Sequence, residues 1–168
     1  HIFFALGQWA RGAASNVESY QAANANRTEA DAGLSGGGFH ALHWLHYARL
    51  QQGRHDDARS VFGTTQTHAT DPSVTTGYAP YMRWYLPVAS VIETRQWDRI
   101  EERIAAMDIQ ADSLGTRGAV TLHAGRGLAA AHQNNLSAAR SALANAEAAL
   151  GGVDEAAIRI QVEELRGL

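Results

Sequence analysis

An internal repeat constrains the fold of this chain more than any other feature. In residues 50–58 an apolar helical pattern ends at Gly53, with a bulky residue two positions later and a small residue five positions later. The same frame recurs around Gly7, Arg95 and Asn134, so successive turns are 39 to 46 residues apart. Glycine and asparagine tolerate the left-handed backbone conformation that ends a helix. The repeat therefore predicts a series of helical hairpins.

The composition supports an all-α chain. Hydrophobic residues make up 45% of the sequence and charged residues 18%, which is enough apolar material for a packed core. Alanine, the best helix former, is abundant, and there are only three prolines. Valine, isoleucine and threonine do not form alternating runs, so no stretch predicts a strand.

The repeat frame and the helical periodicity together predict the organisation of the chain. Residues 26–38, which include Gly36-Gly37-Gly38, are expected to form a loop, and Asp71-Pro72-Ser73 a break. The expected array occupies residues 1–152, followed at 153–168 by a capping or continuing helix that presents Val153, Ala157, Ile160 and Glu164 along one side. The expected hairpins are 1–25 (helices 1–6 and 9–25), 39–69 (39–52 and 55–69), 78–107 (78–95 and 97–107) and 116–150 (116–133 and 136–150).

Charge and residue usage argue against several classes of function. The net charge is −3, and the fourteen basic residues are all arginines without a basic run, which disfavours a nucleic-acid groove. The absence of cysteine excludes disulfides and thiolate metal sites. No apolar stretch approaches the roughly 20 residues of a membrane-spanning helix. A cytoplasmic location is favoured, and a start inside an apolar run, without methionine, suggests a piece of a longer protein.

The segment from Leu45 to Ala58, with Phe62 four residues later, resembles the two-helix unit of tetratricopeptide repeats. The last hairpin is similar through Gly127, Asn134, Ala139, Leu143 and Ala146. The openings at residues 1–7 and 43–53 also resemble a group of uncharacterised bacterial tetratricopeptide proteins. This resemblance implies a right-handed superhelix of antiparallel hairpins. It further implies a protein-interaction scaffold that binds a peptide or helix of another protein in a concave groove, without a cofactor.

In such an array the first helix of each hairpin lines the concave surface, as the resemblance implies. Counting back from each turn in helical register then selects candidate ligand contacts. Imidazole and phenol rings suit a peptide because they stack and form hydrogen bonds with little loss of rotamer entropy. Trp84, beside Tyr81 and Tyr85, is either a packing residue or part of a binding platform. The predicted contacts are His1, His40, His43, Tyr47, Met82, Tyr85, Glu93 and His132.

The histidines also allow a different function. His40, His43 and His46 are spaced three residues apart, so two neighbours could share a metal ion, but all three fan across roughly 120° of the helix. If His1 converged with His40 and His43, the chain would be a helical metal- or small-ligand-binding domain of an enzyme. His46 is instead expected to pack against its partner helix. No nucleophile motif frames the serines or histidines, so no catalytic residue is predicted. A third possibility is that the chain packs against the remainder of its own protein.

Overall fold

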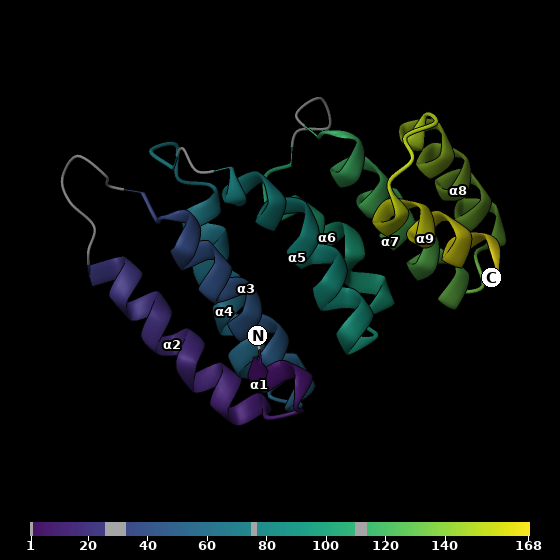
Figure 1. Ribbon diagram of the computed structural model, residues 1–168. Coiled ribbons are helices and arrows are strands. Elements are labelled where there is room, and N and C mark those ends of the chain that lie inside the picture. Colours follow the sequence, from purple (N-terminus) through teal and green to yellow (C-terminus); the bar gives the residue numbers. More distant parts are fainter. Residues whose placement is uncertain (1, 26–32, 75–76, 110–113) are drawn as a thin grey trace. The chain divides into compact units, whose positions relative to one another are not determined.

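The computed structural model describes residues 2–25, 33–74, 77–109 and 114–168, and within these ranges all regular structure is helical, without a strand (Figure 1). The all-α class is therefore confirmed. The chain forms two compact units, residues 1–86 and 87–168. The elements are α1 (Ile2–Ala5), α2 (Trp9–Ala25), α3 (Gly36–Gln51), α4 (His55–Ala69), α5 (Tyr78–Thr94), the 3₁₀ turn η1 (Trp97–Arg99), α6 (Ile100–Ala105), α7 (Thr116–His132), α8 (Leu136–Leu150) and α9 (Ala156–Arg166).

The four turn residues expected from the repeat all adopt the left-handed backbone conformation. The angle φ is +66° at Gly7, +68° at Gly53, +54° at Arg95 and +59° at Asn134. At Gly7, Gly53 and Asn134 the following backbone N–H donates to the carbonyl oxygen five residues earlier, over 2.8 to 2.9 Å. This hydrogen bond satisfies a carbonyl that the end of the helix leaves without an intrahelical partner. The predicted helix ends are thus confirmed at all four turns.

The positions around these turns agree only in part with the repeat frame. The residue five positions after each turn is buried, as expected for the close approach of two helices. The residue two positions after the turn is half-buried at Trp9 and Trp97, but His55 is exposed and Leu136 is 57% exposed. The expectation that a bulky side chain fills the angle of every hairpin is therefore wrong at His55 and Leu136. The buried residues are Gly12, Ala58, Ile100 and Ala139.

The segment Gly36-Gly37-Gly38 is the first turn of α3 and not part of a loop, which corrects the sequence-based expectation. Ser35 caps this helix, since its Oγ accepts a hydrogen bond from the backbone N–H of Gly38 at 3.2 Å. A Cβ atom at Gly38 would lie only 2.4 Å from the side chain of Leu34, which is buried. The glycine is therefore required by packing, and the serine cap offsets its low helix propensity.

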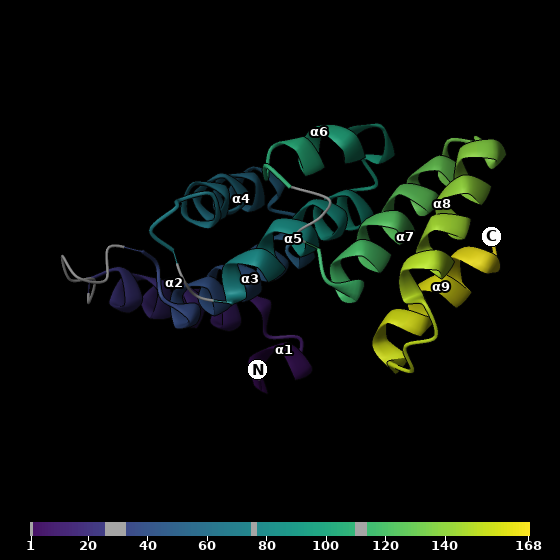
Figure 2. The same ribbon diagram turned by 90° about the horizontal axis from the view of Figure 1, so that it is seen from above.

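In the unit formed by residues 1–86, α3 lies between α2 and α4 (Figure 2). This arrangement explains why α3 carries buried residues on several sides, whereas α2 buries only Gly12 and Ala13. His46 is 1% exposed and its ring lies 6.4 Å from that of Phe62 in α4, so it is a packing residue, as expected. The buried residues of α3 are Gly38, Phe39, Ala41, Leu42, His43, Leu45, His46, Ala48 and Leu50.

In the unit formed by residues 87–168, α7 packs against α6, α8 and α9. Val120 of α7 shares a buried cluster with Ala146 of α8 and with Ile158 and Val162 of α9. The contact between α7 and α9 is close, because a Cβ atom at Gly127 would lie 2.4 Å from the side chain of Leu165.

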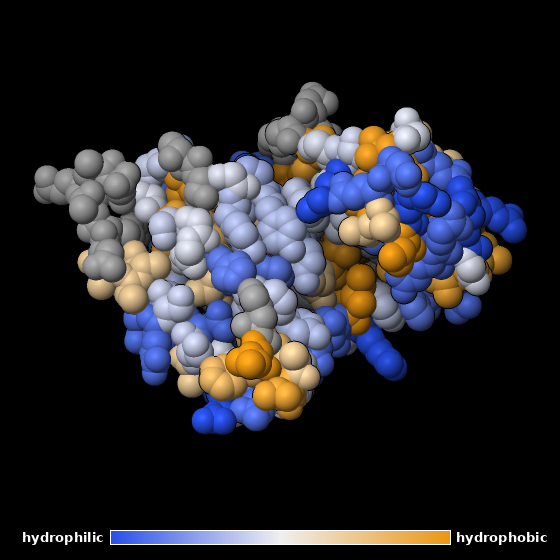
Figure 3. Space-filling view, viewed as in Figure 1, coloured by the Kyte–Doolittle hydropathy of each residue, from blue (hydrophilic) through white to orange (hydrophobic). Residues whose placement is uncertain are grey.

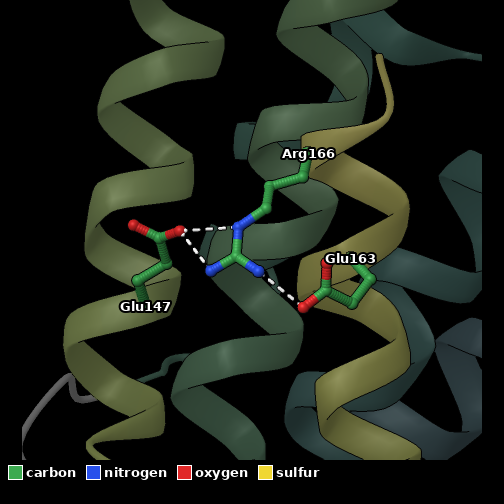
Figure 4. A network of polar contacts seen from close by, with 3 residues as sticks. All are labelled: Glu147, Glu163 and Arg166. Atoms are coloured by element: carbon green, nitrogen blue, oxygen red, sulfur yellow. Dashed lines mark hydrogen bonds and ion pairs between the residues drawn. The ribbon is translucent and has the colours of Figure 1, made fainter.

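Helix α9 begins at Ala156, three residues later than expected. It buries Ile158, Val162 and Leu165, while Ile160, on the side named from the sequence, is 65% exposed. Arg166 holds the end of this helix against α8. Its guanidinium donates to Glu147 at 2.7 and 3.0 Å and to Glu163 at 2.5 Å (Figure 4).

Among the helices that the structure describes, none has both the length and the apolar content required to cross a bilayer.

Candidate functional site

The candidate site is a group of ring side chains on α3 and the first half of α5, here termed the aromatic–histidine surface. Spacings of three and four residues along each helix place these rings on one face. In Figure 3 an orange patch marks the neighbouring α1 and the turn that follows it, where Ile2 and Leu6 are 71% and 64% exposed. The aromatic–histidine surface consists of His40, His43, Trp44 and Tyr47 on α3 and of Tyr78, Tyr81, Trp84 and Tyr85 on α5.

One phenol of α5, that of Tyr78, contacts two histidines of α3. The hydroxyl oxygen of Tyr78 lies 3.1 Å from Nδ1 of His40 and 3.3 Å from Nδ1 of His43. A phenol has one proton, so it can donate to only one of the two imidazoles, and it accepts from the ring N–H of any imidazole to which it does not donate. Burial raises the pKa of Tyr78, so the phenol stays protonated at neutral pH. The Tyr78 hydroxyl therefore fixes the orientation of both imidazoles.

His43 is the central ring of the surface. It is 8% exposed, stacks on Trp44 with centroids 5.1 Å apart, and meets the edge of Tyr85 at 4.6 Å. Burial, and to a lesser extent the neighbouring His40, lower the pKa of His43 from 6.5 to about 4. The imidazole is therefore neutral at pH 7, and the aromatic–histidine surface has an uncharged centre.

Three rings of α5 form the outer part of the surface. Tyr81 and Tyr85 stack with centroids 5.1 Å apart and an interplanar angle of 14°, and Trp84 meets Tyr81 edge-on at 4.8 Å. All three residues are half-buried. These contacts restrict the rotamers of the rings before any ligand binds.

Rings from α1 and α2 continue the surface at its other end. Phe4 stacks on Trp44 at 5.2 Å and on Trp9 at 5.9 Å, and Tyr47 meets the edges of Trp9 and Trp44. Phe4 also lies against Gly12, where a Cβ atom would be 2.3 Å from its ring. The absence of a side chain at Gly12 therefore permits the position of Phe4.

The structure brings together some of the predicted contact residues. His40, His43 and Tyr85 belong to one connected group, and Tyr47 joins it through Trp44. Met82 is 0% exposed and lies in the core. A ligand on the surface cannot reach this side chain, so the burial of Met82 disagrees with the prediction that it contacts a ligand.

The other predicted contacts lie elsewhere. Glu93 is exposed on the second half of α5, in the unit formed by residues 87–168. In the same unit His132 stacks on Trp97 with centroids 4.1 Å apart. His1 lies outside the described residues.

Two residues of this surface, Trp44 and Tyr78, are not among the contacts predicted from the sequence, and Tyr78 is the more informative of the two. Tyr78 precedes Tyr85 by seven residues, which is two helical turns, and that spacing is a signal that it shares the face of Tyr85. Its importance arises from the two histidines of α3, which lie 35 and 38 residues earlier in the sequence.

The metal-binding alternative depends partly on His1. Within the described ranges, no cluster of three or more histidine or carboxylate side chains could hold a metal ion. The Nδ1 atoms of His40 and His43 both face the hydroxyl of Tyr78. A metal ion bound through these atoms would have to displace the phenol.

No family model matches the chain, and neither a curated protein nor a solved structure matches it.

Proposed function

We propose that this chain is a tetratricopeptide-like interaction module, not a catalyst, and that its aromatic–histidine surface binds a peptide or helix of another protein. The proposal is supported by four helix ends that share one left-handed turn geometry. A series of such hairpins offers a rigid, preformed surface. Binding of a ligand therefore costs the receptor little conformational entropy.

The observation that carries the proposal is the preassembled ring network around His43. Tyrosine and tryptophan dominate the binding energy of many protein interfaces, because they bury a large area with few rotatable bonds. Here Tyr81, Trp84 and Tyr85 are half-buried and already held by mutual ring contacts. They combine partial exposure with a low entropic cost of binding.

The chemistry of this surface favours an uncharged or apolar ligand segment. His43 is neutral at pH 7 because burial lowers its pKa, and the other members of the surface are aromatic rings and His40. Phenol and indole groups can donate hydrogen bonds at the rim while their ring faces contact apolar side chains. We therefore expect a partner segment with exposed aliphatic or aromatic residues.

The test uses peptides selected from a random display library on the wild-type protein. Tyr81→Ala should weaken the binding of the selected peptides at least about tenfold, which corresponds to about 1.4 kcal/mol. Tyr20→Ala is the matched control, because Tyr20 is also half-buried but lies on α2, where its hydroxyl contacts His68. The control should bind within about twofold of wild type.

Circular dichroism must show equal helicity for the two variants. Equal affinity of Tyr81→Ala and wild type would reject the aromatic–histidine surface as the binding site. A selection that enriches no peptide would reject peptide binding itself.

A further inference from the structure

The unit formed by residues 87–168 contains a groove between α6, α7 and α8, with a volume of about 560 Å³. This volume lies within the range of about 300–1,000 Å³ that is typical of ligand sites. We name it the amide groove after three of its lining residues, Gln133, Asn135 and Asn145. The helices that form it belong to one compact unit.

The side-chain amides of Gln133 and Asn135 are held in fixed orientations, because one end of each amide group forms hydrogen bonds within the protein. The Nε2 atom of Gln133 donates to the backbone oxygens of Trp97 at 3.1 Å and Ala129 at 3.0 Å. These bonds leave Oε1 of Gln133 as an acceptor. The Oδ1 atom of Asn135 accepts from the backbone N–H of Ala138 at 3.1 Å, which leaves its NH₂ group as a donor. Oε1 of Gln133 and the NH₂ group of Asn135 are therefore held in place and remain able to bond to a ligand.

The charged residues of the groove compensate one another. Arg126 forms two parallel hydrogen bonds to Glu101, at 2.7 and 2.9 Å. Burial, and then the neighbouring Arg126, lower the pKa of His123 below its ordinary value, so that imidazole is neutral at pH 7. The groove thus offers hydrogen bonds without a net charge.

The shape and lining of the groove narrow the class of ligand. Along α8 the wall is made of small residues, which include Ala138, Ser141 and Ala142. Of the residues described as lining it, none is Phe, Tyr or Trp, so there is no aromatic platform of the kind on which nucleobases and sugar rings commonly stack. A polypeptide backbone in extended conformation presents one N–H and one C=O per residue, which match amide side chains.

We propose that the amide groove binds an extended, uncharged peptide segment, chiefly through the backbone of that segment. This site rests on residues 87–168 alone. It is independent of the aromatic–histidine surface, which lies in residues 1–86, so each site can fail without the other.

The probe is an acetylated and amidated pentapeptide of alternating alanine and serine, added to the full ¹⁵N-labelled chain. We expect saturable shifts of the side-chain NH₂ signals of Gln133, Asn135 and Asn145, with a dissociation constant of about 1 mM. The same pentapeptide with methylated backbone nitrogens lacks the N–H donors and should bind at least about tenfold more weakly.

Two substitutions on α8 form a matched pair. Ala138→Met fills the groove and should weaken pentapeptide binding at least about tenfold, whereas Ala148→Met changes an exposed alanine outside the groove and should have less than about a twofold effect. Absent shifts, equal binding of the methylated pentapeptide, or equal effects of the two substitutions would overturn the proposal. Shifts of the same signals by maltotriose and not by the pentapeptide would overturn it in favour of a carbohydrate site.

Discussion

Replacing Gly53 by alanine should destabilise the hairpin of α3 and α4, although the added methyl group meets no other atom. Nothing lies within 4 Å of a Cβ atom at this position, so a steric clash contributes nothing. The cost comes from φ of +68°, which disfavours a residue with a Cβ atom by roughly 1–2 kcal/mol. Alanine also lowers the entropy of the unfolded chain, which offsets roughly 0.4–1 kcal/mol. The net loss of stability is about 1 kcal/mol.

Gly63 provides a matched control in the same hairpin. It lies inside α4, and a Cβ atom there also has nothing within 4 Å. Because its backbone is helical, Gly63→Ala should stabilise the protein by about 1 kcal/mol through helix propensity. The same substitution thus has opposite signs at two uncrowded positions, and only the backbone conformation differs.

Thermal unfolding followed by circular dichroism at 222 nm, together with urea titration, measures this difference. The two variants should differ by about 2 kcal/mol, which corresponds to a Tm difference of about 4–8 °C for a chain of this length. If Gly53→Ala is as stable as wild type, or if Gly63→Ala is destabilised equally, the assignment of a left-handed turn at Gly53 is refuted.

Two further predictions concern His43 and Gly127. Because the pKa of His43 is about 4 in the folded state and 6.5 for a histidine exposed to water in the unfolded chain, the folded state binds fewer protons between these values. The stability from a neutral His43 is therefore fully present above about pH 6.5 and should fall by about 2 kcal/mol at pH 5. In urea titrations His43→Gln should remove this loss of stability at pH 5. The same change at the exposed His55 should leave the loss intact. An unchanged dependence of stability on pH in His43→Gln would contradict the burial argument. Gly127→Ala should destabilise the protein by about 1 kcal/mol in the same assay, because overpacking against Leu165 outweighs the gain in helix propensity. Gly63→Ala, which meets no such contact, shows that gain alone. Increased stability of both variants would contradict the close contact between Gly127 and Leu165.

Part of the aromatic–histidine surface could be predicted from helical register, and part could not. Helical register predicts that His40 and His43 share one face, because they lie within one turn of each other, and both contact the hydroxyl of Tyr78. The prediction that Met82 lies on a ligand surface comes from counting thirteen residues back from Arg95. Over that length a small error in the rotation per residue moves a side chain from the surface into the core. Met82 is fully buried, whereas the adjacent Tyr81 is half-buried.

The sequence by itself determined several local features of this protein, although not the start of α3 at Gly36. The turn at Asn134 and the bounds of α4 and α8 depend on the periodicity of a few neighbouring residues and on their allowed φ angles, which are encoded within one or two helical turns. Tertiary structure alone decided that Leu136 is exposed and that the phenol of Tyr78 lies between two histidines of another helix. Burial and hydrogen bonding of a side chain depend on which helix packs against it, and that neighbour is distant in the chain.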